Sequence, residues 1–236
     1  MQYNKKGNFG ELRIEFKNLE GFGKIVTKDF LTKLVENTIK RATKYFDETG
    51  GDHVFSYREK QLHSVICPSI AGITHSYLIE HPLERRPVDD EKYSGNVDYW
   101  VSYKSISYFI ELKHAYFAYS QELPRESIAR RFRRAIRQLR DIRNGECENL
   151  APGDKGFFKI ALEAVTFFKG SSEKDRLIVV KKQEIVDSFE RLINHAPLDK
   201  ANMYALWLLD KRMKKPIEYS DGNQIFPAVA FIAKVF

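Results

Sequence analysis

The sequence predicts a mixed α/β fold formed by a single domain, residues 1–236. The chain is long enough to bury one sizeable core, and its content of 43% hydrophobic and 30% charged residues is ordinary for a globular protein. Along the chain, segments with helical spacing of apolar residues alternate with short strand-like runs. No internal repeat and no Pro-, Ser- or Gly-rich linker divides it, so one domain is expected.

The N-terminal quarter predicts an extended segment followed by two helices. In the first 24 residues, apolar side chains alternate with charged ones, which favours a strand or hairpin: Leu12, Ile14 and Phe16. A helix is predicted over Lys28–Phe46, with Thr27 as its N-cap and Gly50-Gly51 after its end. A second helix is predicted over Phe55–Ser69.

Three runs rich in β-branched and aromatic residues follow and predict strands: Ile73–His81, Val97–Tyr103 and Ile106–Ala115. Only Lys104-Ser105 separate the last two, so these two strands should form a hairpin. The rest of the chain predicts two helices, over Arg125–Arg143 and Lys182–His195, and three more strands: Phe157–Phe168, Tyr204–Leu209 and Ala228–Val235.

The net charge of +7 is concentrated in one predicted helix. Between Arg125 and Arg143 there are eight arginines against Glu126 and Asp141, which accounts for +6 in 19 residues. Apolar residues in this segment recur at steps of three and four, so the arginines occupy the other faces of the helix. The planar guanidinium suits phosphate recognition, so this face is expected to bind nucleic acid; a merely solvated helix face is the alternative.

Two carboxylates and a lysine are expected to converge in the predicted hairpin. Asp98 lies at the start of one strand, and Glu111-Leu112-Lys113 lies near the end of the other. Residues i and i+2 share a face of a strand, and antiparallel pairing brings Glu111 opposite Asp98 to within about one residue. Carboxylates suit Mg²⁺, which activates water, and a lysine beside it can stabilise developing charge. An acidic-x-Lys triplet alone is a weak signal, and Glu15-Phe16-Lys17 repeats it without an upstream Asp.

In this context the chain resembles the PD-(D/E)xK nuclease superfamily, which has the restriction-endonuclease-like fold. The resemblance covers about residues 55–168, in the order helix, three strands, helix, strand, with additions at 1–54 and 169–236. Asn96-Val97-Asp98 is followed by twelve residues and then Glu111-Leu112-Lys113, with Val97 in place of the family's proline. The resemblance implies an αβββαβ core with a mixed sheet.

The resemblance also assigns roles to individual residues. It implies that Asp98 and Glu111 bind Mg²⁺, with Mn²⁺ as a substitute, that Lys113 assists the attacking water, and that Glu59 is a further metal ligand. Gln138 matches a glutamine of exonuclease-like branches, but Ile142 stands where those branches carry a tyrosine. The expected nucleic-acid-binding residues lie on the arginine-rich helix: Arg130, Arg133, Arg134, Arg137, Gln138 and Arg140.

Each assignment has a structural alternative. Asp98 could cap the hairpin or pair with Lys104, and Glu111 and Lys113 could form an ion pair on a solvated strand. Glu59 could be an exposed helical glutamate, with Glu36 as its rival, and Gln138 could decorate a polar helix face. Tyr116 and Tyr119 could stack on bases, although packing is the expected role. None of the six histidines has the spacing of a metal site.

Other features narrow the class of protein. Two distant cysteines, Cys67 and Cys147, exclude a disulfide framework and a cysteine-rich zinc finger. The N-terminus lacks the apolar region of a signal peptide, and no apolar stretch approaches the roughly 20 residues of a membrane span, so a cytoplasmic protein without a membrane partner is expected.

The sequence therefore predicts an enzyme, a Mg²⁺-dependent nuclease that hydrolyses phosphodiester bonds, with DNA favoured over RNA. The alternative is an inactive module of the same fold that binds nucleic acid or another protein. The intact set of Asp, Glu and Lys favours the enzyme, because binding alone does not require it. The resemblance also leaves room for a homodimer or for a partner protein of a defence system.

Overall fold

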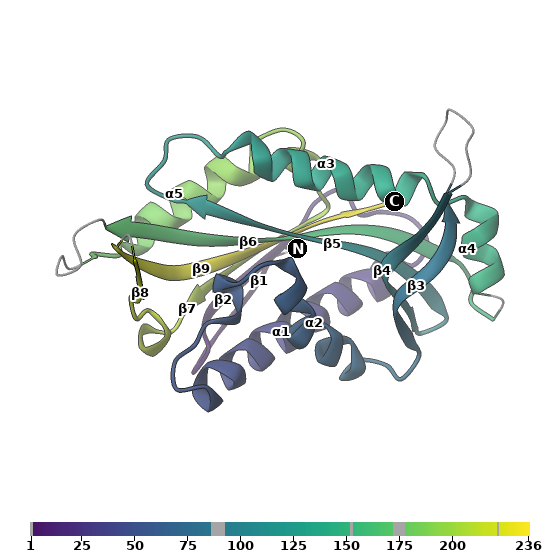
Figure 1. The fold of residues 1–236 in the computed structure, drawn as a ribbon. Helices are drawn as coiled ribbons and strands as arrows, with labels where there is room; N and C mark the ends of the chain where they lie inside the picture. Colours follow the sequence, from purple (N-terminus) through teal and green to yellow (C-terminus); the bar gives the residue numbers. More distant parts are fainter. Residues whose placement is uncertain (1, 86–92, 152, 172–177, 221) are drawn as a thin grey trace.

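The computed structural model describes residues 2–85, 93–151, 153–171, 178–220 and 222–236. These residues form a mixed α/β fold in which helices cover both faces of a central sheet (Figure 1). The α-helices of the described part are α1 (Lys24–Glu48), α2 (Glu59–Ala71), α3 (Glu126–Arg140), α4 (Asn144–Leu150) and α5 (Lys182–Ile193). Each of these helices is too short or too polar to span a bilayer.

One mostly antiparallel sheet contains the nine strands of the described residues: β1 (Gln2–Gly7), β2 (Gly10–Phe16), β3 (Tyr77–Arg85), β4 (Tyr93–Tyr103), β5 (Ile106–Ala118), β6 (Phe157–Ser171), β7 (Met203–Leu209), β8 (Ile217–Tyr219) and β9 (Gly222–Val235). Eight strands follow the order β1-β2-β7-β9-β6-β5-β4-β3, and β8 pairs with β9. Only β5 and β6, of the pairs described, run parallel. The first strand of the chain therefore lies at one edge of the sheet, and the last strand, β9, lies in its centre between β7 and β6.

Two hydrophobic clusters lie on opposite faces of this sheet. One packs α1 and α2 against the sheet around side chains such as Phe30, Ile66 and Trp207. The other packs α3 and α5 around side chains such as Phe132 and Phe189. Residues alternate between the faces along a strand, so Ile110 and Leu112 of β5 face α1 and α2, and their neighbours Glu111 and Lys113 face α3.

The predicted hairpin between β4 and β5 is confirmed. Lys104 and Ser105 connect the strands with φ of 50° and 58°. Two successive residues with positive φ match the twist of the flanking strands, so the connection forms without the favoured glycine. The pairing runs from Tyr103 and Ile106 to Tyr99 and Ile110. The order α2, β3, β4, β5, α3 and β6 also follows the predicted order, with α4 inserted before β6.

The sequence predicted Thr27 as the N-cap of the first helix, and this prediction was wrong. Helix α1 begins at Lys24, and Gly23 with φ of 69° occupies the cap position. A Cβ atom on Gly23 would lie 2.8 Å from Ile106 Cδ1, so the chain enters the helix too close to the sheet for a larger residue. Thr27 is buried one turn inside the helix, with its hydroxyl 3.3 Å from that of Tyr108.

Several other predicted boundaries were wrong. Helix α2 begins at Glu59, because Val54–Ser56 form a separate 3₁₀ turn. The strand predicted to start at Ile73 starts at Tyr77, because Thr74 N–H bonds back to the end of α2 at the carbonyl of Ile70. The arginine-rich helix ends at Arg140 rather than Arg143, and α4 and β8 were not predicted. Asp98 does not open its strand, because β4 begins at Tyr93.

Candidate functional site

The candidate site lies where β4 separates from β5. The last described pair of this ladder is Tyr99 and Ile110, and Asp98 is the next residue of β4. Beyond the last pair, the Leu112 N–H donates to the Asp98 carboxylate, with 2.7 Å between Leu112 N and Asp98 Oδ2. The diverging strands thus turn Asp98 toward β5, and they place its carboxylate next to the predicted Glu-x-Lys triplet.

Three of the predicted acidic residues lie around the ammonium of Lys113, which was also predicted for the site. Its Nζ atom lies 3.5 Å from Glu111 Oε2, 3.8 Å from Asp98 Oδ2 and 3.8 Å from Glu59 Oε1. The ammonium also donates to the carbonyl of Leu112 at 2.7 Å. Glu59 is the first residue of α2, and its other oxygen accepts from the N–H of His114 at 3.1 Å. Side chains from α2, β4 and β5 therefore surround one lysine that is 8% exposed.

Arg85 holds Glu111 in place and was not predicted. It ends β3, is 2% exposed, and forms an ion pair with Glu111, whose side chain is also buried. Its guanidinium also donates to the carbonyl of Asn96 and, at 3.2 Å, to that of Gln138 in α3. The one sequence signal for this contact was Gly95, because a glycine inside a strand indicates that another group approaches closely. In the structure that group is Arg85, whose Nε would lie 2.9 Å from a Cβ atom at position 95.

The charge of Glu111 reflects opposing effects. Burial raises its pKa, as does the nearby Asp98 carboxylate, and Arg85 and Lys113 lower it. The balance brings the pKa of Glu111 to about 7. A cation that binds near Asp98 and Glu111 would therefore favour the ionised form of Glu111 and lower its pKa.

Glu163 is a second buried acid that the sequence reasoning missed. It lies on β6 directly beside Lys113 in the parallel β5–β6 register. Its side chain is fully buried, and neither carboxylate oxygen has a hydrogen-bond partner among the described residues. Burial raises the pKa of Glu163 well above its ordinary value, and the charges of Arg131 and Lys113 oppose this effect. A single acid inside the apolar run Ala161–Val165 was the signal in the sequence.

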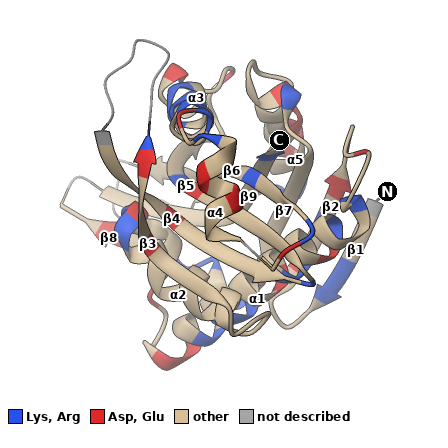
Figure 2. Ribbon diagram, turned by 90° about the vertical axis from the view of Figure 1, so that its right-hand side faces the viewer, with Lys and Arg blue, Asp and Glu red and all other residues tan. Residues whose placement is uncertain are grey.

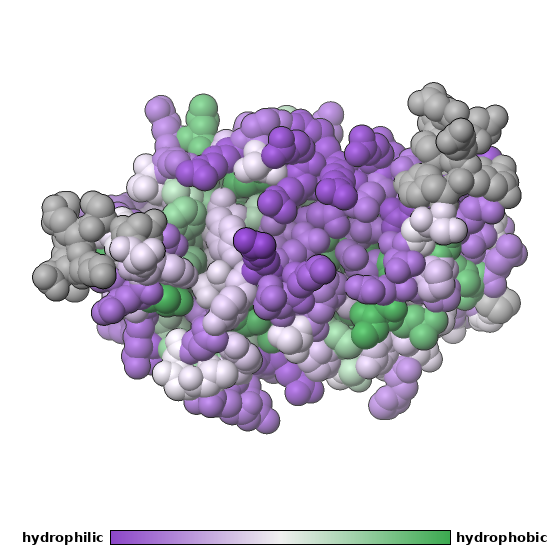
Figure 3. All heavy atoms as spheres, in the orientation of Figure 1, coloured by the Kyte–Doolittle hydropathy of each residue, from purple (hydrophilic) through white to green (hydrophobic). Residues whose placement is uncertain are grey.

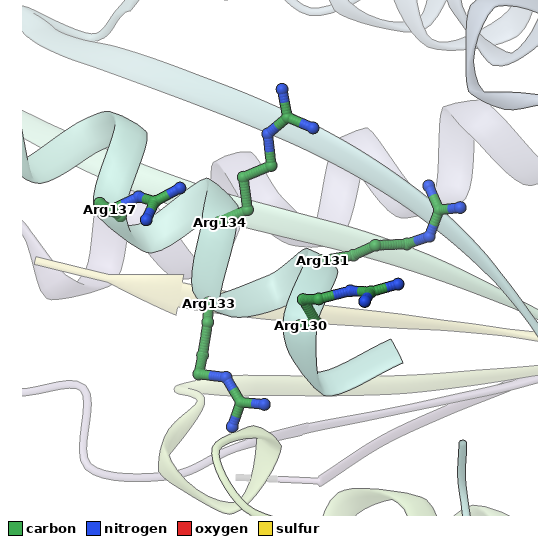
Figure 4. A pocket seen from close by; sticks show the side chains of 5 residues that line it. All are labelled: Arg130, Arg131, Arg133, Arg134 and Arg137. Carbon is green, nitrogen blue, oxygen red and sulfur yellow. The ribbon is translucent and has the colours of Figure 1, made fainter. Parts of the chain in front are cut away.

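Helix α3 presents the predicted arginine face beside this site. Its apolar residues are buried against the sheet, and its arginines are exposed. Figure 2 shows the basic residues as blue segments along α3. The surface over α3 is correspondingly hydrophilic (Figure 3). An open groove of about 780 Å³ is lined by five arginines, shown in Figure 4: Arg130, Arg131, Arg133, Arg134 and Arg137. Of these, Arg133 is paired with Glu126.

The other residues predicted for this face differ in their surroundings. Arg140 is exposed but is not among the described residues that line the groove. Gln138 is half-buried, and its side-chain oxygen is buried without a partner among the described residues. Its backbone carbonyl binds Arg85, so Gln138 connects α3 to the Glu111 ion pair. Arg131, which was not among the predicted residues, acts electrostatically on both Glu163 and His114.

Two alternatives are excluded, namely Lys104 as the partner of Asp98 and Glu36 as the rival of Glu59. Lys104 pairs with Asp29 at 2.8 Å, so it is not the partner of Asp98. Glu36 binds Lys5 at 3.0 Å, away from the cluster. Tyr116 donates to the backbone carbonyls of residues 56 and 57, and Tyr119 is buried in the core, so both tyrosines have packing roles.

The oxygen atoms of this cluster fit a hard divalent cation in their chemistry. Mg²⁺ prefers carboxylate and carbonyl oxygens, which Asp98, Glu111, Glu59 and Leu112 supply. In the described part of the chain, however, no group of three or more acidic, His or Cys side chains is arranged so that it could hold a metal ion. In this structure these oxygens surround the ammonium of Lys113.

No protein-family model, curated protein or solved structure matches this chain. The features of the described residues that bear on function are the cluster around Lys113 and the arginine face of α3. The cluster draws its residues from α2, β4 and β5, whereas the arginine face is formed by one helix.

Proposed function

We propose that the protein is a metal-dependent nuclease of the PD-(D/E)xK type, with DNA favoured over RNA as its substrate. The observation that carries this proposal is the cluster in which Asp98, Glu111 and Glu59 surround Lys113 at 3.5–3.8 Å. The order of α2, β3–β5, α3 and β6 supports the restriction-endonuclease-like core. A purely structural ion pair would not need three carboxylates from three elements around one buried lysine.

Asp98 and Glu111 are the residues that would hold the metal ion. Arg85 neutralises and fixes one oxygen of Glu111, which leaves Oε2 on the side of Lys113 and Asp98. Bound Mg²⁺ would neutralise charge on the phosphate and lower the pKa of a water molecule. Lys113 is placed to orient the attacking water and to stabilise the charge that develops on the phosphoryl oxygens.

The arginine face would position the nucleic acid. Helix α3 packs on β5 and β6, the strands that carry Lys113 and Glu163, so its arginines lie on the same side of the sheet as these two residues. Guanidinium groups bind phosphate oxygens in pairs of hydrogen bonds, and this binding weakens as salt increases because counterions are released. Backbone binding of this kind brings no preference for a base sequence.

A binding module without catalysis is the second candidate. It is favoured by the position of Lys113, whose ammonium stands among the oxygens that a metal ion would need. In such a module the carboxylates would neutralise a structural lysine, and the arginine groove would carry the function.

Cleavage assays on the full chain distinguish the two candidates. Plasmid, linear duplex, single-stranded DNA and RNA are incubated with Mg²⁺, Mn²⁺ or EDTA, using the wild type, Asp98→Asn and Lys113→Met. The matched control is Glu15→Gln with Lys17→Met, which alters the exposed copy of the same triplet. The nuclease predicts metal-dependent cleavage that both site variants lose and the control keeps.

Undiminished cleavage by a folded Asp98→Asn variant would contradict the nuclease assignment. Salt-sensitive binding of DNA without cleavage under any condition would support the binding module instead.

A further inference from the structure

Glu163 has no evident structural reason to be an acid. Its carboxyl group is completely buried, and both oxygens lack hydrogen-bond partners in the described residues. Its neighbours on the same face of β6, Ala161 and Val165, are buried and apolar. A buried polar group without a partner destabilises the folded state, and an apolar residue would avoid this cost. An unpartnered acid beside a candidate active site therefore points to a partner that arrives in another state of the site.

Two cations act on Glu163, Arg131 of α3 and Lys113, and Lys113 is its direct neighbour on the adjacent strand. Lys113 and Glu163 are neighbours in the register of β5 and β6, and paired residues of adjacent strands project from the same face of the sheet. Adjacent strands are about 4.8 Å apart, a distance that a lysine side chain with four methylene groups spans easily. Burial raises the pKa of Glu163, and the charges of Arg131 and, to a smaller extent, Lys113 oppose this effect.

The present position of Lys113 conflicts with metal binding. Its ammonium lies 3.5 Å from Glu111 Oε2 and 3.8 Å from Asp98 Oδ2, so it occupies the space that these two carboxylates would share with a cation. It donates its hydrogen bond to the carbonyl of the preceding residue, Leu112. A divalent cation at Asp98 and Glu111 would repel the ammonium in this partly buried environment. The ammonium must then find another acceptor within reach.

We propose that Glu163 is a positioning residue for Lys113, which accepts the ammonium when a divalent cation binds to Asp98 and Glu111. This inference rests on the proposed metal site. In the state described here, Lys113 neutralises the carboxylates around it. In the metal-bound state it pairs with Glu163, remains next to the reacting phosphate, and leaves the Asp98 and Glu111 oxygens to the cation. The two oxygens of Glu163, which have no hydrogen-bond partner among the described residues, are the acceptors for the displaced ammonium.

A double-mutant cycle on metal binding tests the exchange without reference to cleavage. Mn²⁺ binding to the full chain is measured by calorimetry for the wild type, Glu163→Gln, Lys113→Met and the double variant. We expect Glu163→Gln to weaken Mn²⁺ binding about tenfold when Lys113 is present, because the displaced ammonium has lost its acceptor. We expect less than a twofold effect in the Lys113→Met background, where no ammonium has to move.

Circular dichroism and urea unfolding establish that each variant is folded. If Glu163→Gln does not fold, it is replaced by Glu163→Asp, which keeps the charge on a shorter side chain. This variant should weaken Mn²⁺ binding when Lys113 is present and have little effect in the Lys113→Met background. Glu15→Gln is the surface control and should bind Mn²⁺ like the wild type.

Equal weakening in both backgrounds would overturn the exchange, since Glu163 would then act on the metal directly. An unchanged affinity of Glu163→Gln in the presence of Lys113 would also overturn it. Failure of all variants and the wild type to bind Mn²⁺ would overturn both this inference and the proposed metal site. If the effect of Glu163→Gln on Mn²⁺ binding depends on Lys113 but no substrate is cleaved, the exchange is supported and only the nuclease assignment is contradicted.

Discussion

Replacement of His53 by Phe should remove a specific part of the acid sensitivity of this protein. His53 is 3% exposed, and neither ring nitrogen has a hydrogen-bond partner among the described residues. Four aromatic rings surround its ring, with centroids 6.2–6.5 Å away: those of Phe46, Phe55, Trp207 and Phe226. Phenylalanine can occupy this apolar site without a ring nitrogen, so the substitution preserves the packing and removes the titrating group.

The size of the effect follows from the pKa of His53. Burial lowers this pKa from 6.5 to about 4, against a smaller opposing effect of Asp52. Between these two values the unfolded chain binds a proton that the folded chain excludes, so the free energy of unfolding falls as the pH decreases. The loss is complete at about pH 4 and amounts to about 3 kcal/mol, since one pKa unit corresponds to about 1.4 kcal/mol. Above pH 6.5 this histidine has no effect on the pH dependence.

Urea unfolding at several pH values between 7.5 and 4 measures this difference. The wild type should lose about 3 kcal/mol more than His53→Phe over this range. The buried His114, whose pKa burial lowers to about 3, adds a similar loss to both proteins, so it cancels in the comparison. His75→Gln, at an exposed position, should follow the wild type. Parallel curves for His53→Phe and the wild type would refute the reasoning.

Three further predictions concern ion pairs and the arginine face. Arg85→Met should lower the free energy of unfolding at pH 7 by about 3–5 kcal/mol in urea titrations, because it leaves a buried carboxyl group without its cation; a loss below 1 kcal/mol would contradict this. Arg134→Glu with Arg137→Glu should weaken duplex DNA binding at least tenfold and reduce the salt slope in fluorescence anisotropy, and Arg41→Glu on the opposite face should change neither. Partial burial opposes ionisation of Asp29, but hydrogen bonds from Lys104, Tyr103 and Lys33 outweigh it and lower the pKa of Asp29 to about 2. Asp29→Asn should therefore cost about 1 kcal/mol at pH 7, a value reduced for solvent screening, and the difference should disappear as the pH falls from about 4 to 2; a constant difference would contradict this pairing.

Local patterns in the sequence were sufficient to predict much of the candidate site. The helical spacing of Ile128, Phe132 and Leu139 predicted a helix that buries one face and exposes its arginines, as observed. Two residues between strand-like runs predicted the β4–β5 hairpin, and the hairpin brings Asp98 to the Glu-x-Lys triplet. These features depend on neighbours within about 15 residues, so the sequence contains the information directly.

The sequence by itself therefore determined the mixed α/β class, the arginine face and the meeting of Asp98 with Glu111 and Lys113. Only the tertiary structure decided that the two ends of the chain join the sheet through β2, β7 and β9. It also decided that Arg85 is buried against Glu111, and that Glu163 lies beside Lys113 without a partner in the described residues. The physical reason is that strand order and register are set by contacts between distant segments. An isolated arginine or glutamate looks the same in sequence whether those contacts bury it or leave it in water.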